Sequence, residues 1–285
     1  MKYIVCAHKI FNENAECLSQ KINVPITSTI DAKAGDVYII FGAHVIADKL
    51  LMLQRDVKVG YIILNSEPEN NMYLKNKYYI SLMKSNPVFC YDKPSGDNLK
   101  KEFGINCFSS FFFEFMKIDY DQERPIDILF VGTQSAERVA IRDALKKKYP
   151  EKKIEFVFDE ALIDANKMKQ ALALSKVVLN IPFYNNDSLE THRIHNALSC
   201  GCKVLSHNKC EDTLRRFYEP YVTFCDDVTN FDFETIKEKG SYEDLVKMLS
   251  QMFYPHMLHT IKRICGNSID EEGATGENQQ PKSSL

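Results

Sequence analysis

The stretch SLETHRIHNALSCGCKVLS, residues 188–206, concentrates carboxylate, guanidinium, imidazole and thiol groups in one predicted helix and the strand that follows it. At about 100° per residue, the aliphatic residues of this helix form one arc that can pack on a sheet. Glu190, Arg193 and Asn196 then lie beside that arc and can face a single ligand. The types and spacing of these residues suit either a phosphate or a metal ion.

The first turn of the helix is a candidate anion site. We predict that the helix begins at Ser188, where free N–H groups and the helix dipole favour a phosphate. Arg193 would add a planar fork of donors one turn further on, and His192 is near enough to the start to touch a phosphate. Gly201 suits the left-handed cap that ends the helix. Alternatively, Glu190 and Arg193 form only an i,i+3 surface pair, which contributes roughly a few tenths of a kcal/mol.

A zinc site is the competing interpretation of the same segment. The soft ligands are sufficient in number: His192, His195, Cys200, Cys202, His207 and Cys210. Cys200 and Cys202, however, straddle a helix end and enter a strand, where alternate residues face different ways. No spacing matches a zinc finger or ribbon, so we predict no metal. The nine cysteines are odd in number and include no CxxC pair, which indicates buried thiols in a reducing compartment.

Composition excludes several other classes of protein. The net charge of −3 leaves no basic surplus for nucleic acid or an anionic membrane. No apolar run approaches the roughly 18–20 residues that cross a bilayer, and the N-terminal segment lacks a signal-peptide pattern. We therefore expect a soluble, cytoplasmic protein with no transmembrane segment and no nucleic-acid partner.

The elements that must position these residues fall into two series. Residues 1–117 give strands at 3–8, 24–29, 36–44, 58–67, 87–92 and 105–115, with helical patterns at 13–21, 45–53, 72–84 and 96–103 between them. A polar stretch at 116–125 is the best linker candidate. The pattern restarts over 126–265, with strands at 127–133, 153–158, 176–183, 202–207 and 222–227 and helices at 135–150, 160–174, 188–199 and 242–264. We predict an α/β protein with two Rossmann-like, doubly wound parallel-sheet domains that face a cleft, and a disordered tail at 266–285.

The segment RIHNALSCGCKVLS resembles the donor-site segment of GT-B-type glycosyltransferases, whose pattern is close to R-x-x-E-A-L-A-C-G-x-P-V-[IL]-[ST]. DILFVGTQSAERVAIRDAL resembles the opening strand, glycine turn and helix of the same half, and GYIILNSEP resembles a segment of small members. Short members also occur in large DNA viruses, in which case the location would be the host cytoplasm. Retaining members often carry two glutamates eight positions apart, where this chain has Ser188 and Asn196, and Lys203 replaces the usual proline. The stereochemical course is therefore left open.

The resemblance implies transfer of a sugar from a nucleoside-diphosphate sugar to a hydroxyl of a glycan or glycoconjugate, with no metal or other cofactor. Residues 1–117 would hold the acceptor and 126–265 the nucleotide sugar. The donor-binding residues would be Gly132, Thr133, Arg138, Tyr184, Ser188, Glu190, His192, Arg193 and Asn196.

An inverting course would also require a base that takes the acceptor proton. Glu67 and His8 are the candidates at strand ends of the first half, and His44 is a weaker one; each could instead be a cap or a loop residue. A non-catalytic protein that binds nucleotides or sugar phosphates on the same fold is the alternative function. A flavodoxin-like tandem that acts through protein contacts is a third. Neither half has GxGxxG after its first strand, which disfavours a dinucleotide oxidoreductase.

Overall fold

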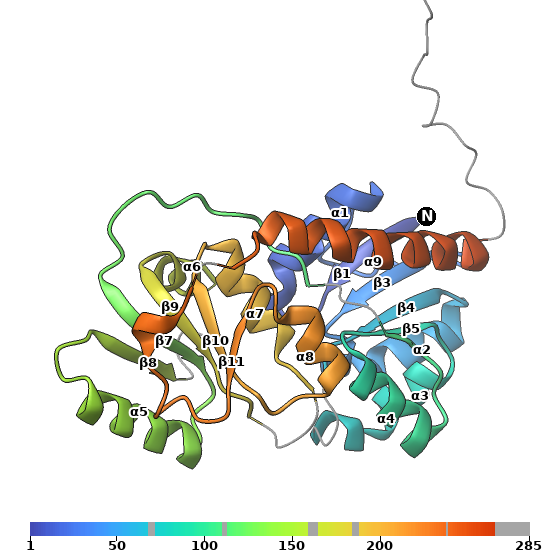
Figure 1. Ribbon diagram of the computed structural model, residues 1–285. Coiled ribbons are helices and arrows are strands. Elements are labelled where there is room, and N and C mark those ends of the chain that lie inside the picture. The colour runs from blue at the N-terminus through green and yellow to red at the C-terminus, as the bar shows by residue number, and fades with distance from the viewer. Residues whose placement is uncertain (68–71, 110–112, 159–164, 184–187, 238, 266–285) are drawn as a thin grey trace, which may run out of the picture.

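The computed structural model describes residues 1–67, 72–109, 113–158, 165–183, 188–237 and 239–265. They form two α/β halves, each built on a parallel sheet (Figure 1). This confirms the predicted fold class. The predicted linker, 116–125, contains no helix or strand, and the predicted disordered tail lies outside the described residues.

The first sheet has the order β2-β1-β3-β4-β5-β6. Its strands are β1 (Lys2–Cys6), β2 (Ile26–Thr27), β3 (Val37–Phe41), β4 (Gly60–Asn65), β5 (Val88–Cys90) and β6 (Phe108–Ser109). Its helices are α1 (Asn12–Ile22), α2 (Ala47–Val57), α3 (Lys77–Lys84) and α4 (Lys93–Phe103), with short 3-10 turns η1 (Lys9–Phe11), η2 (Ala43–Val45) and η3 (Met72–Lys75). Every residue of β3 is buried. A strand covered on both faces is apolar throughout, which is why VYIIF is such a clear signal.

The second sheet has the order β11-β10-β9-β7-β8. Its strands are β7 (Ile126–Gly132), β8 (Ile154–Phe158), β9 (Ser175–Asn180), β10 (Lys203–His207) and β11 (Thr223–Cys225). Its helices are α5 (Ala136–Lys148), α6 (Ala165–Ala173), α7 (Thr191–Ser199) and α8 (Asp212–Tyr218), followed by η5 (Phe233–Thr235). Neither α8 nor the 3-10 turns were predicted, and β6 is shorter than the strand predicted at 105–115.

The last helix, α9 (Tyr242–Cys265), connects the two halves. It starts beside the second half and runs across to the first (Figure 1). Near its start, the Tyr242 hydroxyl accepts a hydrogen bond of 2.8 Å from the Phe115 N–H. Further along, the Phe253 ring meets the ring of Phe89 from β5 at 5.8 Å between centroids. The helix therefore belongs to the core of both halves.

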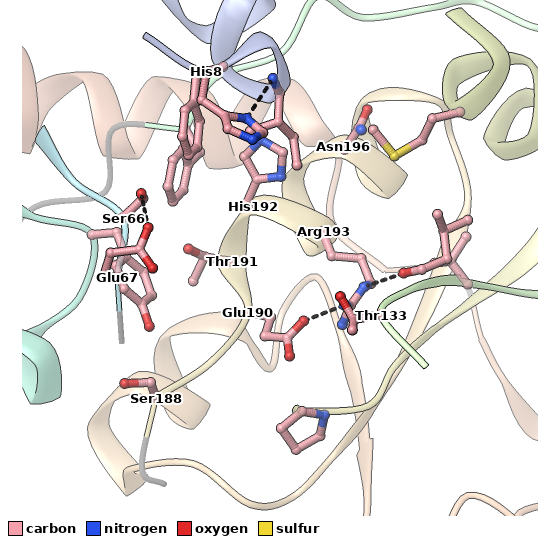
Figure 2. Close-up of a pocket in the computed structure, with 18 of the residues that line it drawn as sticks. His8, Ser66, Glu67, Thr133, Ser188, Glu190, Thr191, His192, Arg193 and Asn196 are labelled. Carbon is pink, nitrogen blue, oxygen red and sulfur yellow. Dashed lines mark hydrogen bonds and ion pairs between the residues drawn. The ribbon is translucent and has the colours of Figure 1, made fainter. Parts of the chain in front are cut away.

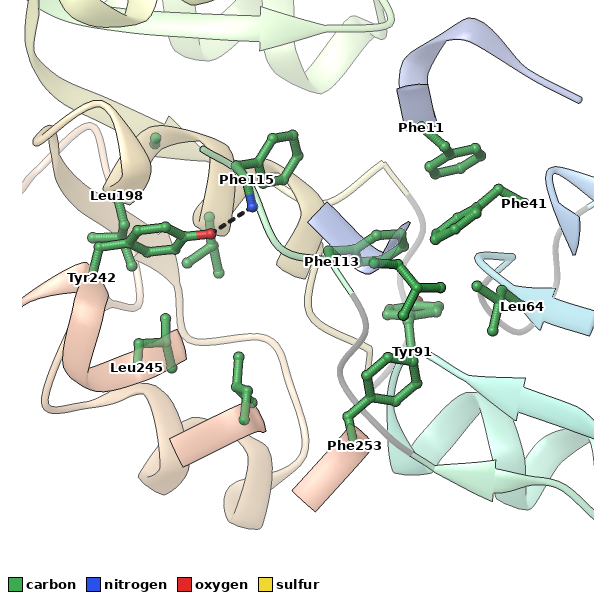
Figure 3. Packing of buried hydrophobic residues seen from close by; sticks show 14 of the residues in the cluster. Phe11, Phe41, Leu64, Tyr91, Phe113, Phe115, Leu198, Tyr242, Leu245 and Phe253 are labelled. Carbon is green, nitrogen blue, oxygen red and sulfur yellow. Dashed lines mark hydrogen bonds between the residues drawn. The ribbon is translucent and has the colours of Figure 1, made fainter. Parts of the chain in front are cut away.

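The buried apolar residues in the described part of the chain form three clusters. One lies on the outer face of the first sheet and one on the outer face of the second. The third and largest is shared, because it joins residues of both halves, among them Phe11, Phe113, Leu198, Tyr242 and Phe253 (Figure 3). A single apolar core thus runs through the junction and fixes the two sheets relative to each other.

Candidate functional site

A cleft of about 410 Å³ lies between the two halves. Its walls come from the loops that follow the carboxyl ends of parallel strands: His8 after β1, His44 after β3, Thr133 after β7 and Pro182 after β9. In each sheet these are the strands between which the chain order reverses, β1/β3 in the first and β7/β9 in the second. Open α/β sheets bind ligands at such switch points, so both sheets direct their natural binding edge into one cavity.

Helix α7 supplies one wall of the cleft and leaves polar atoms there without partners. Thr191 Oγ1, His192 Nε2 and Asn196 Oδ1 are buried and have no hydrogen-bond partner within the described part of the chain, and all three residues line the cleft (Figure 2). An unpaired buried polar group costs about 1–3 kcal/mol. Three of them on two successive turns therefore indicate a place prepared for a polar ligand. Asn196 and His192 were predicted; Thr191 was missed, although a hydroxyl in the first helical turn was a usable signal.

Arg193, Arg138 and Glu190 form a compact ionic network at the back of this wall. Arg193 Nε donates to the Val131 carbonyl at 3.0 Å and its Nη1 to Asn180 Oδ1 at 2.9 Å, while Nη2 pairs with Glu190 Oε2. Arg138 is fully buried and its Nη2 lies 3.0 Å from Glu190 Oε1. Two guanidinium groups share one carboxylate, which leaves a net charge of +1 behind the cleft.

Gly132 makes room for the two arginines. A Cβ at this position would lie 3.0 Å from Arg193 Nη2, 3.3 Å from Arg138 Nη1 and 2.9 Å from the Phe130 ring. Both guanidinium groups also stack on that ring, at 4.8 Å for Arg138 and 5.1 Å for Arg193. The glycine that ends β7 thus shapes the network, although neither it nor Arg138 lines the cleft itself.

The start of α7 differs from the prediction. The helix begins at Thr191 rather than Ser188, and Glu190 is the N-cap residue without a capping hydrogen bond from its side chain. Its carboxylate instead accepts from Arg138 and from the Phe183 N–H at 2.7 Å. These partners draw the carboxylate away from the helix end. Ser188 still lines the cleft, with its Oγ 3.4 Å from Ser95 Oγ of the first half, and Tyr184 lies outside the described residues.

The two histidines of α7 are neutral, and both contact aromatic rings. His192 contacts the rings of Phe113 and Phe115, each at 4.9 Å, and burial lowers its pKa to about 3. His195 Nδ1 lies 2.5 Å from the Phe113 carbonyl oxygen and its Nε2 lies 2.7 Å from the Tyr218 hydroxyl. His192 therefore offers no positive charge to a phosphate, and His195 ties the segment before the linker to the second half. Gly201 is left-handed after the helix, as predicted, with φ 70°.

The opposite wall carries the predicted acid–base residues. Glu67 follows β4 and is buried, with its Oε1 accepting from Ser66 Oγ at 3.1 Å and lying 3.1 Å from His44 Nδ1. Burial raises the pKa of Glu67 to about 7 and lowers the pKa of His44 to about 4. The exposed ring of Tyr73 packs against His44 at a tilt of 38°, with 4.4 Å between the ring centroids, and completes this wall. Ser66 and Tyr73 were not predicted.

His8 also lines the cleft, but its ring is oriented by a local hydrogen bond. Its Nδ1 accepts from the Ile10 N–H at 3.3 Å and so caps η1. A neutral imidazole that accepts at Nδ1 carries its proton on Nε2, which makes the other nitrogen a donor. Of the predicted bases, Glu67 is better arranged to accept a proton.

The described residues show neither a metal-ligand cluster nor a membrane-spanning helix. No three or more His, Cys, Asp or Glu side chains gather in a group that could hold a metal ion. No described helix combines the length and apolar character that crossing a membrane requires.

Neither the family models nor the curated proteins contain a match to this sequence. Among solved structures, HepE from Anabaena in complex with UDP and glucose aligns with 94% of this chain and 93% of that chain, at 9% identity and a TM-score of 0.49. AviGT4, a glycosyltransferase involved in avilamycin A biosynthesis, aligns over 93% and 98%, at 9% identity and a TM-score of 0.49. The GtfA/B complex aligns with 84% of this chain at 11% identity and a TM-score of 0.40, and this chain spans about half of that one, 55%. Two parallel α/β halves that face one cleft are the GT-B architecture.

Proposed function

We propose that the protein is a glycosyltransferase that moves a sugar from a nucleoside-diphosphate sugar to a hydroxyl of a glycan or glycoconjugate acceptor, without a metal ion or other cofactor. One observation carries the proposal. Buried polar atoms of Thr191, His192 and Asn196 have no hydrogen-bond partner among the described residues, on the cleft wall formed by α7 at the switch points of two facing sheets. A ligand with many hydrogen-bonding groups would satisfy them.

The second half has the electrostatics that a leaving diphosphate needs. The helix dipole places a partial positive charge at the first turn of α7, although the N–H groups of Thr191 and Arg193 already donate to the Leu189 and Glu190 carbonyls. Arg193 has one N–H of Nη2 uncommitted within its described contacts, and Arg138 contributes a second positive charge from behind. Negative charge grows on the diphosphate as the sugar departs, and donors held in place beforehand stabilise it most. Glu190 serves in this account to hold the two arginines, and Thr133 and Ser188 border the same space.

The first half supplies a base for the acceptor hydroxyl. Glu67 accepts a hydrogen bond from Ser66 and lies beside His44, and a carboxyl whose pKa is about 7 is matched to proton transfer near neutral pH. A base across the cleft from the donor wall is what an inverting transfer requires. Transfer should rise with pH through about 7, because Glu67 must lose its proton before it can accept one.

A thermal-shift screen of UDP, GDP, ADP and TDP, each with and without its sugars, tests this function. Ligand at 100 times its Kd should stabilise the native state by about 2.7 kcal/mol, and EDTA should not change the response. Release of the nucleoside diphosphate from the best donor is then followed with and without candidate acceptors. Unchanged melting with every nucleotide would refute the proposal. Binding with neither hydrolysis nor transfer would instead favour a non-catalytic binding protein.

A further inference from the structure

Two thiols lie next to each other at the edge of the first sheet. Cys90 is the last residue of β5 and Cys107 immediately precedes β6, the strand that pairs with it. Their Sγ atoms are 3.1 Å apart. Cys90 is buried, whereas Cys107 is half-buried and can be reached from solvent. No role for this pair follows from the cleft or the proposed transfer.

We propose that Cys90 and Cys107 are a reversible dithiol modification site, which a small-molecule disulfide such as glutathione disulfide converts into an intrachain disulfide bond. The Cys107 thiolate attacks one sulfur of the reagent, breaks its S–S bond and releases one glutathione thiolate. The Cys90 thiol then gives up its proton, and its sulfur attacks the Cys107 sulfur and expels the second glutathione. Two protein thiols are oxidised to one disulfide, and one glutathione disulfide is reduced to two glutathione thiols.

The surroundings of the pair are shaped to bring the sulfurs together. Gly96 of α4 lies against them, and a Cβ there would be 2.9 Å from Cys107 Sγ and 2.6 Å from Ser109 Oγ. Any larger residue would displace Cys107 or its neighbour. The absence of a side chain at position 96 thus preserves the space in which Cys107 reaches Cys90.

The two thiols also differ in the way that exchange requires. The hydrogen bond from Cys90 lowers the pKa of the Cys107 thiol, which favours its thiolate as the first attacking group. Burial raises the pKa of Cys6 to about 11 and that of Cys225 to about 12. Those thiols are half-buried like Cys107, so accessibility alone does not distinguish them. Cys107 differs from them in having the sulfur of Cys90 beside its own.

The pair is one side chain away from the turn that carries Glu67. Asn65 Nδ2 lies 3.7 Å from Cys90 Sγ and donates to the Glu67 carbonyl at 3.1 Å, while Asn65 Oδ1 accepts from the Glu67 N–H. Closing the disulfide would bring the sulfurs to about 2.05 Å and move Cys90 Sγ relative to Asn65. Oxidation would therefore alter the contacts of Asn65, which holds the Glu67 turn at one wall of the cleft.

The test is a peptide map of the full-length protein after incubation with glutathione disulfide. Free thiols are blocked with N-ethylmaleimide and the protein is digested with trypsin without reduction. Cleavage separates the two cysteines into peptides 85–100 and 102–117. We expect one joined species of these two peptides, which dithiothreitol resolves into its halves. The joined species should be absent in Cys107→Ser and in Cys90→Ala and should persist in the control Cys225→Ser.

Three results would overturn the proposal. Cys90 and Cys107 could both be recovered as maleimide adducts, Cys107 could carry glutathione while Cys90 remains alkylated, or either could be joined to another cysteine in preference. Cys90→Ala alters a buried position, so circular dichroism must first show that it folds. If it does not, Cys107→Ser decides the question alone, because its side chain is half-buried.

Discussion

Replacing Glu67 by glutamine should change how the stability of the protein depends on pH. The Glu67 carboxyl is only 8% exposed, and burial raises its pKa from 4.5 to about 7. Glutamine keeps the shape and the hydrogen-bonding ability of the side chain but carries no titrating proton. The comparison between wild type and Glu67→Gln therefore isolates the cost of ionising this one group inside the fold.

The sign and size of the effect follow from linkage. Between pH 4.5 and 7 the folded protein keeps the Glu67 proton that the unfolded chain has already lost, so this group's contribution to stability falls as the pH rises and is constant above 7. Each pKa unit corresponds to 1.36 kcal/mol, so the shift from 4.5 to about 7 gives at most about 3 kcal/mol. His44, whose pKa is lowered to about 4, titrates in an overlapping window with the opposite sign. The pH dependence of wild-type stability alone therefore does not reveal the contribution of Glu67.

Urea unfolding at pH 5, 6, 7 and 8 measures the difference in unfolding free energy between the two proteins. We expect the unfolding free energy of Glu67→Gln, relative to that of the wild type, to increase by about 2–3 kcal/mol between pH 5 and 7. It should increase by little more between pH 7 and 8. Glu102→Gln, which removes an exposed carboxylate, is the matched control. A wild-type minus Glu67→Gln difference that stays the same at every pH would refute the argument that this carboxyl is held in a desolvated, proton-retaining site.

Three further substitutions test the packing behind the site. Gly132→Ala forces a Cβ to within 3.0 Å of Arg193 Nη2, and we expect a loss of about 1–3 kcal/mol of stability together with weaker diphosphate binding; calorimetric affinity equal to wild type would argue against the role given to this glycine. Tyr242→Phe leaves the buried Phe115 N–H without its acceptor and should cost about 1–3 kcal/mol in urea unfolding, so an unchanged midpoint would count against that bond. Phe253→Ala empties part of the core shared by the two halves and should cost about 3–5 kcal/mol, lowering the melting of both halves together; a shift confined to one of two separate transitions would contradict a common core.

Much of the fold could be predicted from sequence because its signals are local. Strands such as 37–41 and 126–132 are buried on both faces or nearly so, and they appear as continuous apolar runs that end at a glycine or a polar residue. The rule that ligands bind beyond parallel strands then placed His8, Glu67 and Thr133 on one cleft, and all three line it. Local pattern and topology were sufficient for these residues.

The rest of the site depends on contacts between segments far apart in the chain. Glu190 has its i,i+3 neighbour Arg193 as a visible partner in sequence, yet its carboxylate is also held by Arg138, 52 residues away. His195 was one of the possible zinc ligands in sequence, yet its ring bonds Phe113, 82 residues away, and Tyr218. Tyr73 lines the cleft beside His44, whose ring it contacts from 29 residues further along the chain. A local sequence pattern does not show which distant residue a side chain will contact.

Calorimetric titration of the wild type and of Arg193→Ala with each of the four nucleoside diphosphates tests the central claim most directly. The claim is that the cleft wall formed by α7, with Arg193 in that wall and Arg138 behind it, binds a diphosphate. Loss of a hydrogen bond to a charged group is worth about 1.5–3 kcal/mol, so we predict that one nucleoside diphosphate binds the wild type and that Arg193→Ala binds it roughly 10–150-fold more weakly. Equal affinity in the variant, or no binding of any of the four to the wild type, would contradict the account.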